Sequence, residues 1–134
     1  MLLQPKKFKY KKQQKKTLKN LNFKSYDLKF GTVGLKSTIS GTISAKQIES
    51  ARQAISRKIK RKGKLWIRIF PNLPVSSKPL ESRMGKGKGS LKHWAAKVIG
   101  GTVLFELCGV KERLAFAAFK TDGAKLPVKT LIFR

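Results

Sequence analysis

The sequence predicts an α+β fold, a single domain in which two helices pack on a mixed or antiparallel sheet. Short apolar segments with strand-like alternation recur along the chain, bounded by glycine and proline. Helical periodicity interrupts them only twice, over residues 45–62 and 111–125. This order is typical of α+β folds and not of a regular βαβ repeat. At 134 residues, the chain is long enough for one modest core.

Residues 1–24 are predicted to form an extended basic arm. They contain nine lysines and no acidic residue, and like charges at this density disfavour an isolated fold. The aromatic residues Phe8, Tyr10 and Phe23 lie among the lysines, a pattern that suits stacking on bases as well as contact with phosphates. We expect the arm to become ordered on binding; a solvated, disordered tail is the alternative.

Residues 25–134 are predicted to form the folded domain. Between Asp27 and Ser44, glycines punctuate two apolar segments, which predicts two short strands joined by a turn or bulge. Ser44 and Gln47 have the spacing of a capping box, so a helix should begin at residue 45 and end before Gly63. Its buried face should carry Ile48, Ala51, Ile55 and Ile59.

The opposite face of this helix is cationic. Six cations crowd toward its C-terminal end: Arg52, Arg57, Lys58, Lys60, Arg61 and Lys62. The favourable interaction of cations with the C-terminal end of the helix dipole explains two or three of these six residues. The remainder indicate a surface that binds an anionic partner.

Further strands and one helix complete the prediction. Residues 65–70 alternate as a strand with one aliphatic face and one aromatic and cationic face. Pro71, Pro74 and Pro79 predict an extended connection. A strand at 93–98 should turn at Gly100-Gly101 into a hairpin partner at 103–107.

The second helix, residues 111–125, should be followed by a closing strand at 128–133. Pro127 prevents the helix from continuing much further. The residues expected on its buried side are Leu114, Ala115, Ala118 and Phe119.

An extended loop is predicted over residues 78–92. Its centre, Arg83-Met84-Gly85-Lys86-Gly87-Lys88-Gly89, has a glycine at every second position, which suits neither a helix nor a strand. It matches neither phosphate-binding nucleotide motif. We expect the loop to present cations and backbone N–H groups to a negatively charged target; a flexible, solvated surface loop is the alternative.

The charge of the chain points to nucleic acid. Its formal net charge is +26, from 32 Lys and Arg against 6 Asp and Glu. An isolated compact domain with this charge repels itself, and a polyanionic partner relieves the repulsion. The acidic residues are scattered, and Cys108 and His93 are single, so we expect no catalytic residues, no metal site and no cofactor. No apolar run is long enough for a membrane span.

Three ordered motifs resemble a known family. They are the helix segment beginning Lys46-Gln47-Ile48-Glu49, the strand segment Trp66-Ile67-Arg68-Ile69-Phe70-Pro71, and the run from Lys78-Pro79-Leu80 to Gly89. The chain resembles the large-subunit ribosomal protein sixteen family of bacteria and organelles, over nearly its whole length. The resemblance implies an α/β-hammerhead domain that binds large-subunit ribosomal RNA. One departure is Thr121-Asp122-Gly123, where the family usually has an alanine-rich helix end.

The resemblance also implies a site beside aminoacyl-tRNA, with the loop Arg83–Gly89 near the peptidyl-transferase region. It implies neighbouring ribosomal proteins as partners, support of tRNA accommodation, and a role late in subunit assembly. We expect ribosomal RNA to be contacted by these cations: Lys6, Lys7, Lys9, Lys11, Lys12, Lys15, Lys16, Arg52, Arg57, Lys60, Arg61, Lys64 and Arg68.

The cellular compartment is predicted from composition. Lysine outnumbers arginine 25 to 7, as in proteins from AT-rich genomes, and the chain starts directly on the family's first residues. We expect synthesis within a mitochondrion, with a plastid or the bacterial cytoplasm as the alternative.

Two other functions compete with a structural ribosomal role. A generic basic protein would bind any nucleic acid or anionic membrane equally well, without an ordered loop. An RNA-modifying enzyme would need a catalytic constellation, which the sequence lacks.

Overall fold

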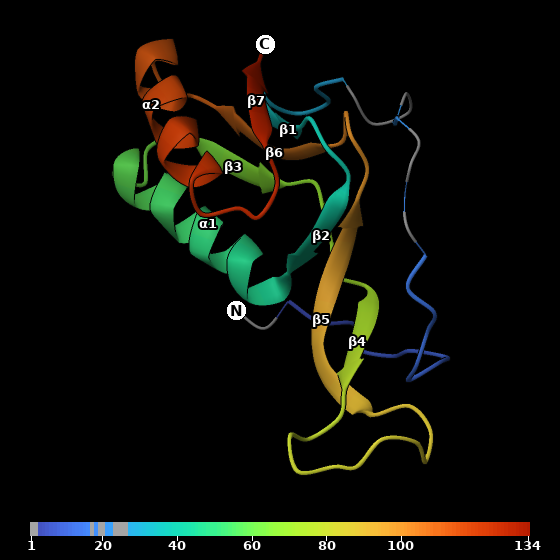
Figure 1. Cartoon of the computed structure of the whole chain (residues 1–134). Helices are drawn as coiled ribbons and strands as arrows, with labels where there is room; N and C mark the ends of the chain where they lie inside the picture. Colours follow the sequence, from blue (N-terminus) through green and yellow to red (C-terminus); the bar gives the residue numbers. More distant parts are fainter. Residues whose placement is uncertain (1–2, 17, 19–20, 23–26) are drawn as a thin grey trace.

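The computed structural model confirms a single α+β domain with two helices (Figure 1). It describes residues 3–16, 18, 21–22 and 27–134. Within these residues the elements, in chain order, are β1 (Val33–Ser37), β2 (Gly41–Ser44), α1 (Ala45–Lys58), β3 (Lys64–Ile67), β4 (Leu73–Ser77), β5 (Ser90–Val98), β6 (Val103–Cys108), α2 (Glu112–Gly123) and β7 (Thr130–Phe133).

The strands form two sheets rather than one. The larger has the order β3-β6-β1-β7 and the smaller the order β2-β5-β4, and all their strand pairs are antiparallel. The chain passes between the sheets four times: from β1 to β2, from β2 through α1 to β3, from β3 to β4, and from β5 to β6 (Figure 1). Hydrogen bonds join the β1–β2 crossing to the β5–β6 crossing, since Gly101 N–H donates to the Ser37 carbonyl at 2.7 Å and Ser37 N–H donates to the Thr102 carbonyl at 3.0 Å.

Helix α1 begins as predicted. The Ser44 hydroxyl accepts a hydrogen bond from Gln47 N–H at 3.3 Å, and the Gln47 side-chain oxygen accepts one from Ser44 N–H at 2.9 Å. This reciprocal pair satisfies two N–H groups at the helix start. The predicted apolar face is buried in one core with residues of α2, β1 and β6.

The end of α1 differs from the prediction. The helix ends at Lys58, and the turn is made by Lys60 and Arg61, whose φ angles are 53° and 61°, not by Gly63. Gly63 is needed for another reason: a Cβ there would lie 2.3 Å from the Cys108 carbonyl oxygen. Glycine therefore allows the start of β3 to pass close to the end of β6.

Two predictions about the strands are wrong. Gly100-Gly101 does not form a hairpin, because β5 already pairs with β2 on one side and β4 on the other, and the chain crosses to the other sheet. The proline-rich connection contains a strand, β4, which includes Pro74. Proline is tolerated there because β4 is an edge strand, where a missing N–H donor need not break the ladder.

Helix α2 buries Ala115, Ala118 and Phe119 as predicted, whereas Leu114 is half-buried. It continues through Thr121-Asp122-Gly123, and the Asp122 side chain is fully buried. Neither carboxylate oxygen of Asp122 has a hydrogen-bond partner among the described residues. Burial raises the pKa of this carboxyl to about 7, although the positive charge of Lys125 acts in the opposite direction.

A second buried carboxylate, Glu106 in β6, is fully satisfied. It accepts hydrogen bonds from the backbone N–H groups of Lys29, Phe30 and Gly31, at 3.2, 2.7 and 2.8 Å to Oε2, and it forms an ion pair with Arg68. Burial alone would raise the Glu106 pKa, but the three N–H donors and the Arg68 charge outweigh it and hold the pKa below its ordinary value.

We predict that Glu106→Gln lowers the free energy of unfolding by about 3–5 kcal/mol at pH 7, because Arg68 loses its buried partner. Since the folded pKa is depressed, the ionised Glu106 stabilises the fold above the unfolded pKa of about 4.3, and this contribution is lost as pH falls through the folded value. Urea unfolding between pH 3 and 7 measures both effects.

The matched control for this substitution is Glu112→Gln, which removes the exposed ion pair of Glu112 with Arg134. An exposed pair contributes about 0–1 kcal/mol, so little change is expected. Equal losses from Glu106→Gln and Glu112→Gln would show that the buried carboxylate does not hold residues 29–31 in place.

For Asp122, the sign of the pH dependence is opposite. Its pKa of about 7 lies above the unfolded value, so the folded chain holds the proton more tightly. The contribution of Asp122 to stability therefore falls as pH rises from about 4 to 7. We predict that Asp122→Asn removes this decline and is more stable than the wild type at pH 8, by an amount on the order of 1–4 kcal/mol. Thermal melting of both proteins across this range checks the prediction, which identical pH profiles would refute.

Candidate nucleic-acid interface

The outer face of α1 and the turn after it surround a shallow hollow of about 640 Å³, here called the α1 hollow. Its lining consists of Arg52, Gln53, Ser56, Arg57, Lys60 and Arg61. Four of these are cations predicted from the sequence to bind RNA, and the structure brings them together around one concave surface. Such a surface suits an RNA phosphate, which cationic side chains contact without reading sequence.

The turn after α1 orients two of these cations. Lys60 and Arg61 both have left-handed φ angles, a conformation that costs about 1–2 kcal/mol for a residue with a side chain. Backbone hydrogen bonds maintain it: Arg61 N–H donates to the Ser56 carbonyl at 3.0 Å, and Lys60 N–H donates to the Arg57 carbonyl at 3.2 Å. The turn therefore directs both exposed side chains to the same hollow as Arg57.

Arg52 is less free than its neighbours. Its guanidinium donates to Glu49 through Nε at 3.0 Å and Nη2 at 2.7 Å. The hydrogen bond from Arg52 lowers the pKa of Glu49, against the effect of burial, and the same bond raises the pKa of Arg52. Arg57, Lys60 and Arg61 form no ion pair among the residues that the structure describes, so their charge is more available to a ligand.

The basic arm lies along the smaller sheet. All seven arm lysines predicted to bind RNA are exposed. The Phe8 ring contacts the Trp94 ring edge-on, with 5.3 Å between centroids. Further along, Lys12 Nζ donates to the Lys88 carbonyl at 2.7 Å, and Lys88 Nζ donates to the Gln13 carbonyl at 2.5 Å. The arm is thus joined to the glycine- and lysine-rich loop; Phe23 lies outside the described residues.

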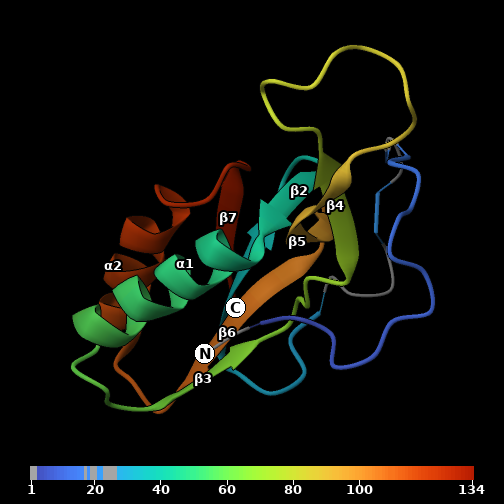
Figure 2. The same cartoon turned by 90° about the horizontal axis from the view of Figure 1, so that it is seen from below.

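The glycine- and lysine-rich loop, residues 78–89, projects from the body of the domain between β4 and β5 (Figures 1 and 2). Gly85, Lys86 and Gly87 have φ angles of 86°, 51° and 83°, so the tip curls through left-handed conformations. Apart from the adjacent residues of the chain, no atom lies within 4 Å of a Cβ built at Gly85 or Gly87. The apolar side chains of Leu80 and Met84 are almost completely exposed. Because the loop projects from the domain and its side chains are exposed, a partner can contact it.

The two cations predicted on β3 differ from each other. Lys64 is exposed, and its Nζ lies 5.2 Å from the centroid of the Trp66 ring. Arg68 is mostly buried and paired with Glu106, so its charge is compensated within the fold. Arg68 therefore holds the structure together more than it offers a free charge to RNA.

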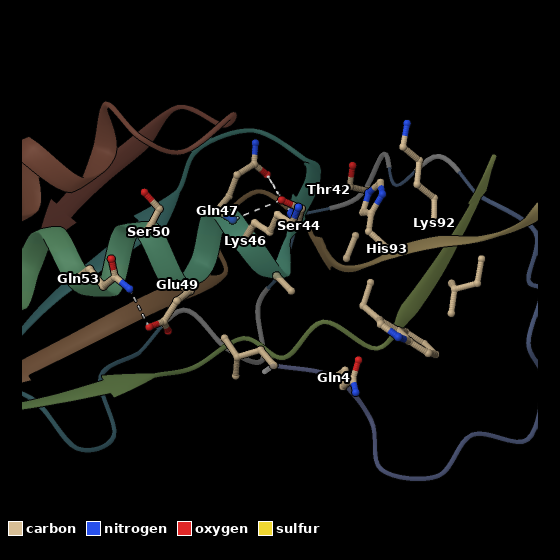
Figure 3. Close-up of a pocket in the computed structure, with 15 residues that line it drawn as sticks. Gln4, Thr42, Ser44, Lys46, Gln47, Glu49, Ser50, Gln53, Lys92 and His93 are labelled. Carbon is tan, nitrogen blue, oxygen red and sulfur yellow. Dashed lines mark hydrogen bonds between the residues drawn. The ribbon is translucent and has the colours of Figure 1, made fainter. Parts of the chain in front are cut away.

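A second hollow was not predicted from the sequence. It has a volume of about 930 Å³ and lies between the start of α1 and β5 (Figure 3). Lys46, Lys92 and His93 line it together with neutral side chains such as Gln4 and Thr42. The described residues contain no group of three His, Cys, Asp or Glu that could hold a metal ion. His93 emerges here from β5, and the lining includes one carboxylate, that of Glu49, besides the two lysines.

Within the described part of the chain, no helix combines the length and apolar character needed to cross a membrane. Exposed cations gather on the arm, around the α1 hollow and on the projecting loop, and hydrogen bonds join the arm to the loop.

Comparisons with known proteins agree with this surface. The family model for ribosomal protein L16p/L10e matches residues 5–133. Two bacterial proteins, each called large ribosomal subunit protein uL16, from Francisella tularensis subsp. holarctica (strain LVS) and Dichelobacter nodosus (strain VCS1703A), are 54% identical over 129 residues. These alignments cover 96% of this chain and 94% of each relative. The chain belongs to the ribosomal protein L16p/L10e family.

Proposed function

We propose that this protein is a structural constituent of the large ribosomal subunit and binds large-subunit ribosomal RNA through the arm, the α1 hollow and Lys64. The family match over almost the whole chain carries this proposal. The family is one of ribosomal proteins and not of enzymes, which agrees with the predicted lack of catalysis. The net charge of +26 supplies the electrostatic attraction to RNA.

We further propose that the loop Arg83–Gly89 reaches toward aminoacyl-tRNA near the peptidyl-transferase region. Its projection from the body, the open space around Gly85 and Gly87, and its contact with the arm through Lys88 support this role. A loop anchored at its base can hold Lys86 and Lys88 in place near tRNA phosphates. Through this contact the protein would support tRNA accommodation and complete the subunit late in its assembly.

For the cellular compartment, we propose a ribosome of bacterial type. The relatives named above are bacterial, and their 54% identity supports a ribosome of bacterial type. It supports the bacterial cytoplasm more than the mitochondrion that the excess of lysine predicts. A generic polyanion binder is disfavoured, because the arm and loop are joined in a defined arrangement.

The test of ribosomal RNA binding uses the triple variant Arg57→Gln, Lys60→Gln and Arg61→Gln. We expect it to leave large subunits at lower salt than the wild type, because each lost phosphate contact reduces the salt slope of binding by about 0.9. Sedimentation through gradients of increasing salt measures the release.

A matched control removes three exposed cations at α2 instead: Lys111→Gln, Arg113→Gln and Lys120→Gln. This variant should sediment like the wild type. If both triple variants dissociate at the same salt concentration, net charge and not the α1 hollow determines binding. A wild-type protein that never sediments with large subunits would refute the ribosomal role itself.

For the loop, we predict that Lys86→Ala with Lys88→Ala leaves the melting temperature of the free protein almost unchanged, because the tip is exposed. Gly87→Val should have a similarly small effect on the core but should resist the φ of 83° at the tip. Ribosomes carrying these changes should accommodate aminoacyl-tRNA slowly. Stopped-flow accommodation measures this, with Lys111→Ala and Lys120→Ala as the charge-matched control. Normal accommodation in the loop variants would exclude a tRNA role for the loop.

A further inference from the structure

Two aromatic rings stack on the face of the four-stranded sheet that points away from the helices. Trp66 belongs to β3, where its neighbours Leu65 and Ile67 pack against the core shared with α1 and α2. Because side chains alternate along a strand, Trp66 lies on the opposite face. The Phe30 ring stacks on it with 6.0 Å between centroids and 19° between planes. We call this pair the Phe30–Trp66 stack.

The outer member of the stack is exposed to solvent. Phe30 is 58% exposed and does not belong to the hydrophobic core. The other aromatic pair of the described residues is different: Phe8 contacts Trp94 edge-on, and Trp94 is buried. Packing of the core therefore does not explain why an aromatic ring is held at residue 30.

The position of Phe30 is fixed by its backbone. Its N–H group donates to Glu106 Oε2 at 2.7 Å, and the N–H groups of both neighbours donate to the same carboxylate. A ring attached to a buried anchor loses little freedom when a ligand covers it. This preorganisation reduces the entropic cost of binding.

Two cationic side chains lie close to the rings of the Phe30–Trp66 stack. Lys64 Nζ lies 5.2 Å from the Trp66 centroid, and Arg68 Cζ lies 5.2 Å from the Phe30 centroid. The acidic group beneath them, Glu106, is buried and neutralised by Arg68. An exposed ring close to the free charge of Lys64 combines the two elements that bind single-stranded nucleic acid: a π face for a base and positive charge for its phosphate.

We propose that the Phe30–Trp66 stack is a platform for one unpaired base of large-subunit ribosomal RNA, with Lys64 beside the phosphate of that nucleotide. The base must be unpaired, because bases inside a duplex already stack on both faces. This inference rests on the proposed ribosomal RNA binding and assigns to it a base-stacking contact.

The experiment uses the full chain and two probes, an oligouridylate of eight nucleotides and the same oligomer without bases. Phe30→Leu keeps an apolar side chain but removes the ring. Phe116→Leu is the matched control, since Phe116 is 38% exposed on α2, on the other side of the sheet. Phe30→Trp restores a ring, and Lys64→Gln removes the adjacent charge. Affinities are measured over a range of salt concentrations, and thermal melting confirms that each variant is folded.

We expect Phe30→Leu to weaken binding of the intact oligomer by about fivefold to a hundredfold. The slope against salt should stay unchanged, because stacking releases no counterions. Lys64→Gln should instead reduce the slope by about 0.7. Phe116→Leu should bind like the wild type, Phe30→Trp should recover the affinity, and the oligomer without bases should not distinguish Phe30→Leu from the wild type.

Equal affinities of Phe30→Leu and Phe116→Leu for the intact oligomer would overturn the platform. An equal effect of Phe30→Leu on both oligomers would overturn it as well, because the lost affinity would then not depend on a base. These outcomes would leave the proposed function intact as long as the wild type binds large-subunit ribosomal RNA. Failure of the wild type to bind that RNA at all would instead overturn the proposed function.

Discussion

The Glu106 carboxylate is buried in β6, and a buried charge is stable only when hydrogen-bond donors or an opposite charge surround it. The backbone of residues 29–31 and the guanidinium of Arg68 supply them. This single anion therefore holds the segment before β1 on the outer face of the larger sheet, sets Phe30 against Trp66, and withdraws Arg68 from the free cationic surface. The helices cover one face of that sheet, and this polar anchor organises the other.

Local sequence patterns predicted the helices well because their signals are local. The capping box at Ser44 and the isoleucine spacing of α1 depend on residues within a few turns of each other. The two-sheet arrangement depends on distant partners. Nothing near Gly100-Gly101 indicates that β5 has a neighbour on each side, so the local turn signal predicts a hairpin that does not form. Thr121-Asp122-Gly123 is a departure from the family's usual helix end, but nothing local predicts that the Asp122 side chain is buried, since an aspartate near a helix end usually faces solvent.

The sequence predicts which cations belong to the candidate site, but not how they are arranged in space. Charge alone identified the cations of α1, yet their grouping depends on the left-handed turn at Lys60 and Arg61, which glycine-based rules do not anticipate. Charge also could not separate Lys64, which is free, from Arg68, which is paired with a residue 38 positions away. The alternation of residues 65–70 indicated an aromatic and cationic face, but the stacking partner Phe30 lies far away in the sequence.

The position of β1 between β6 and β7 has a consequence for folding during synthesis. β7, at residues 130–133, supplies one of the two neighbours of β1, so the larger sheet is complete only when these residues have left the ribosome that makes them. Until then, β1 retains an unpaired edge, and unpaired edges favour aggregation. The nascent chain already carries most of its positive charge at this stage. Until β7 pairs with β1, the nascent chain therefore combines an unpaired strand edge with a high positive charge.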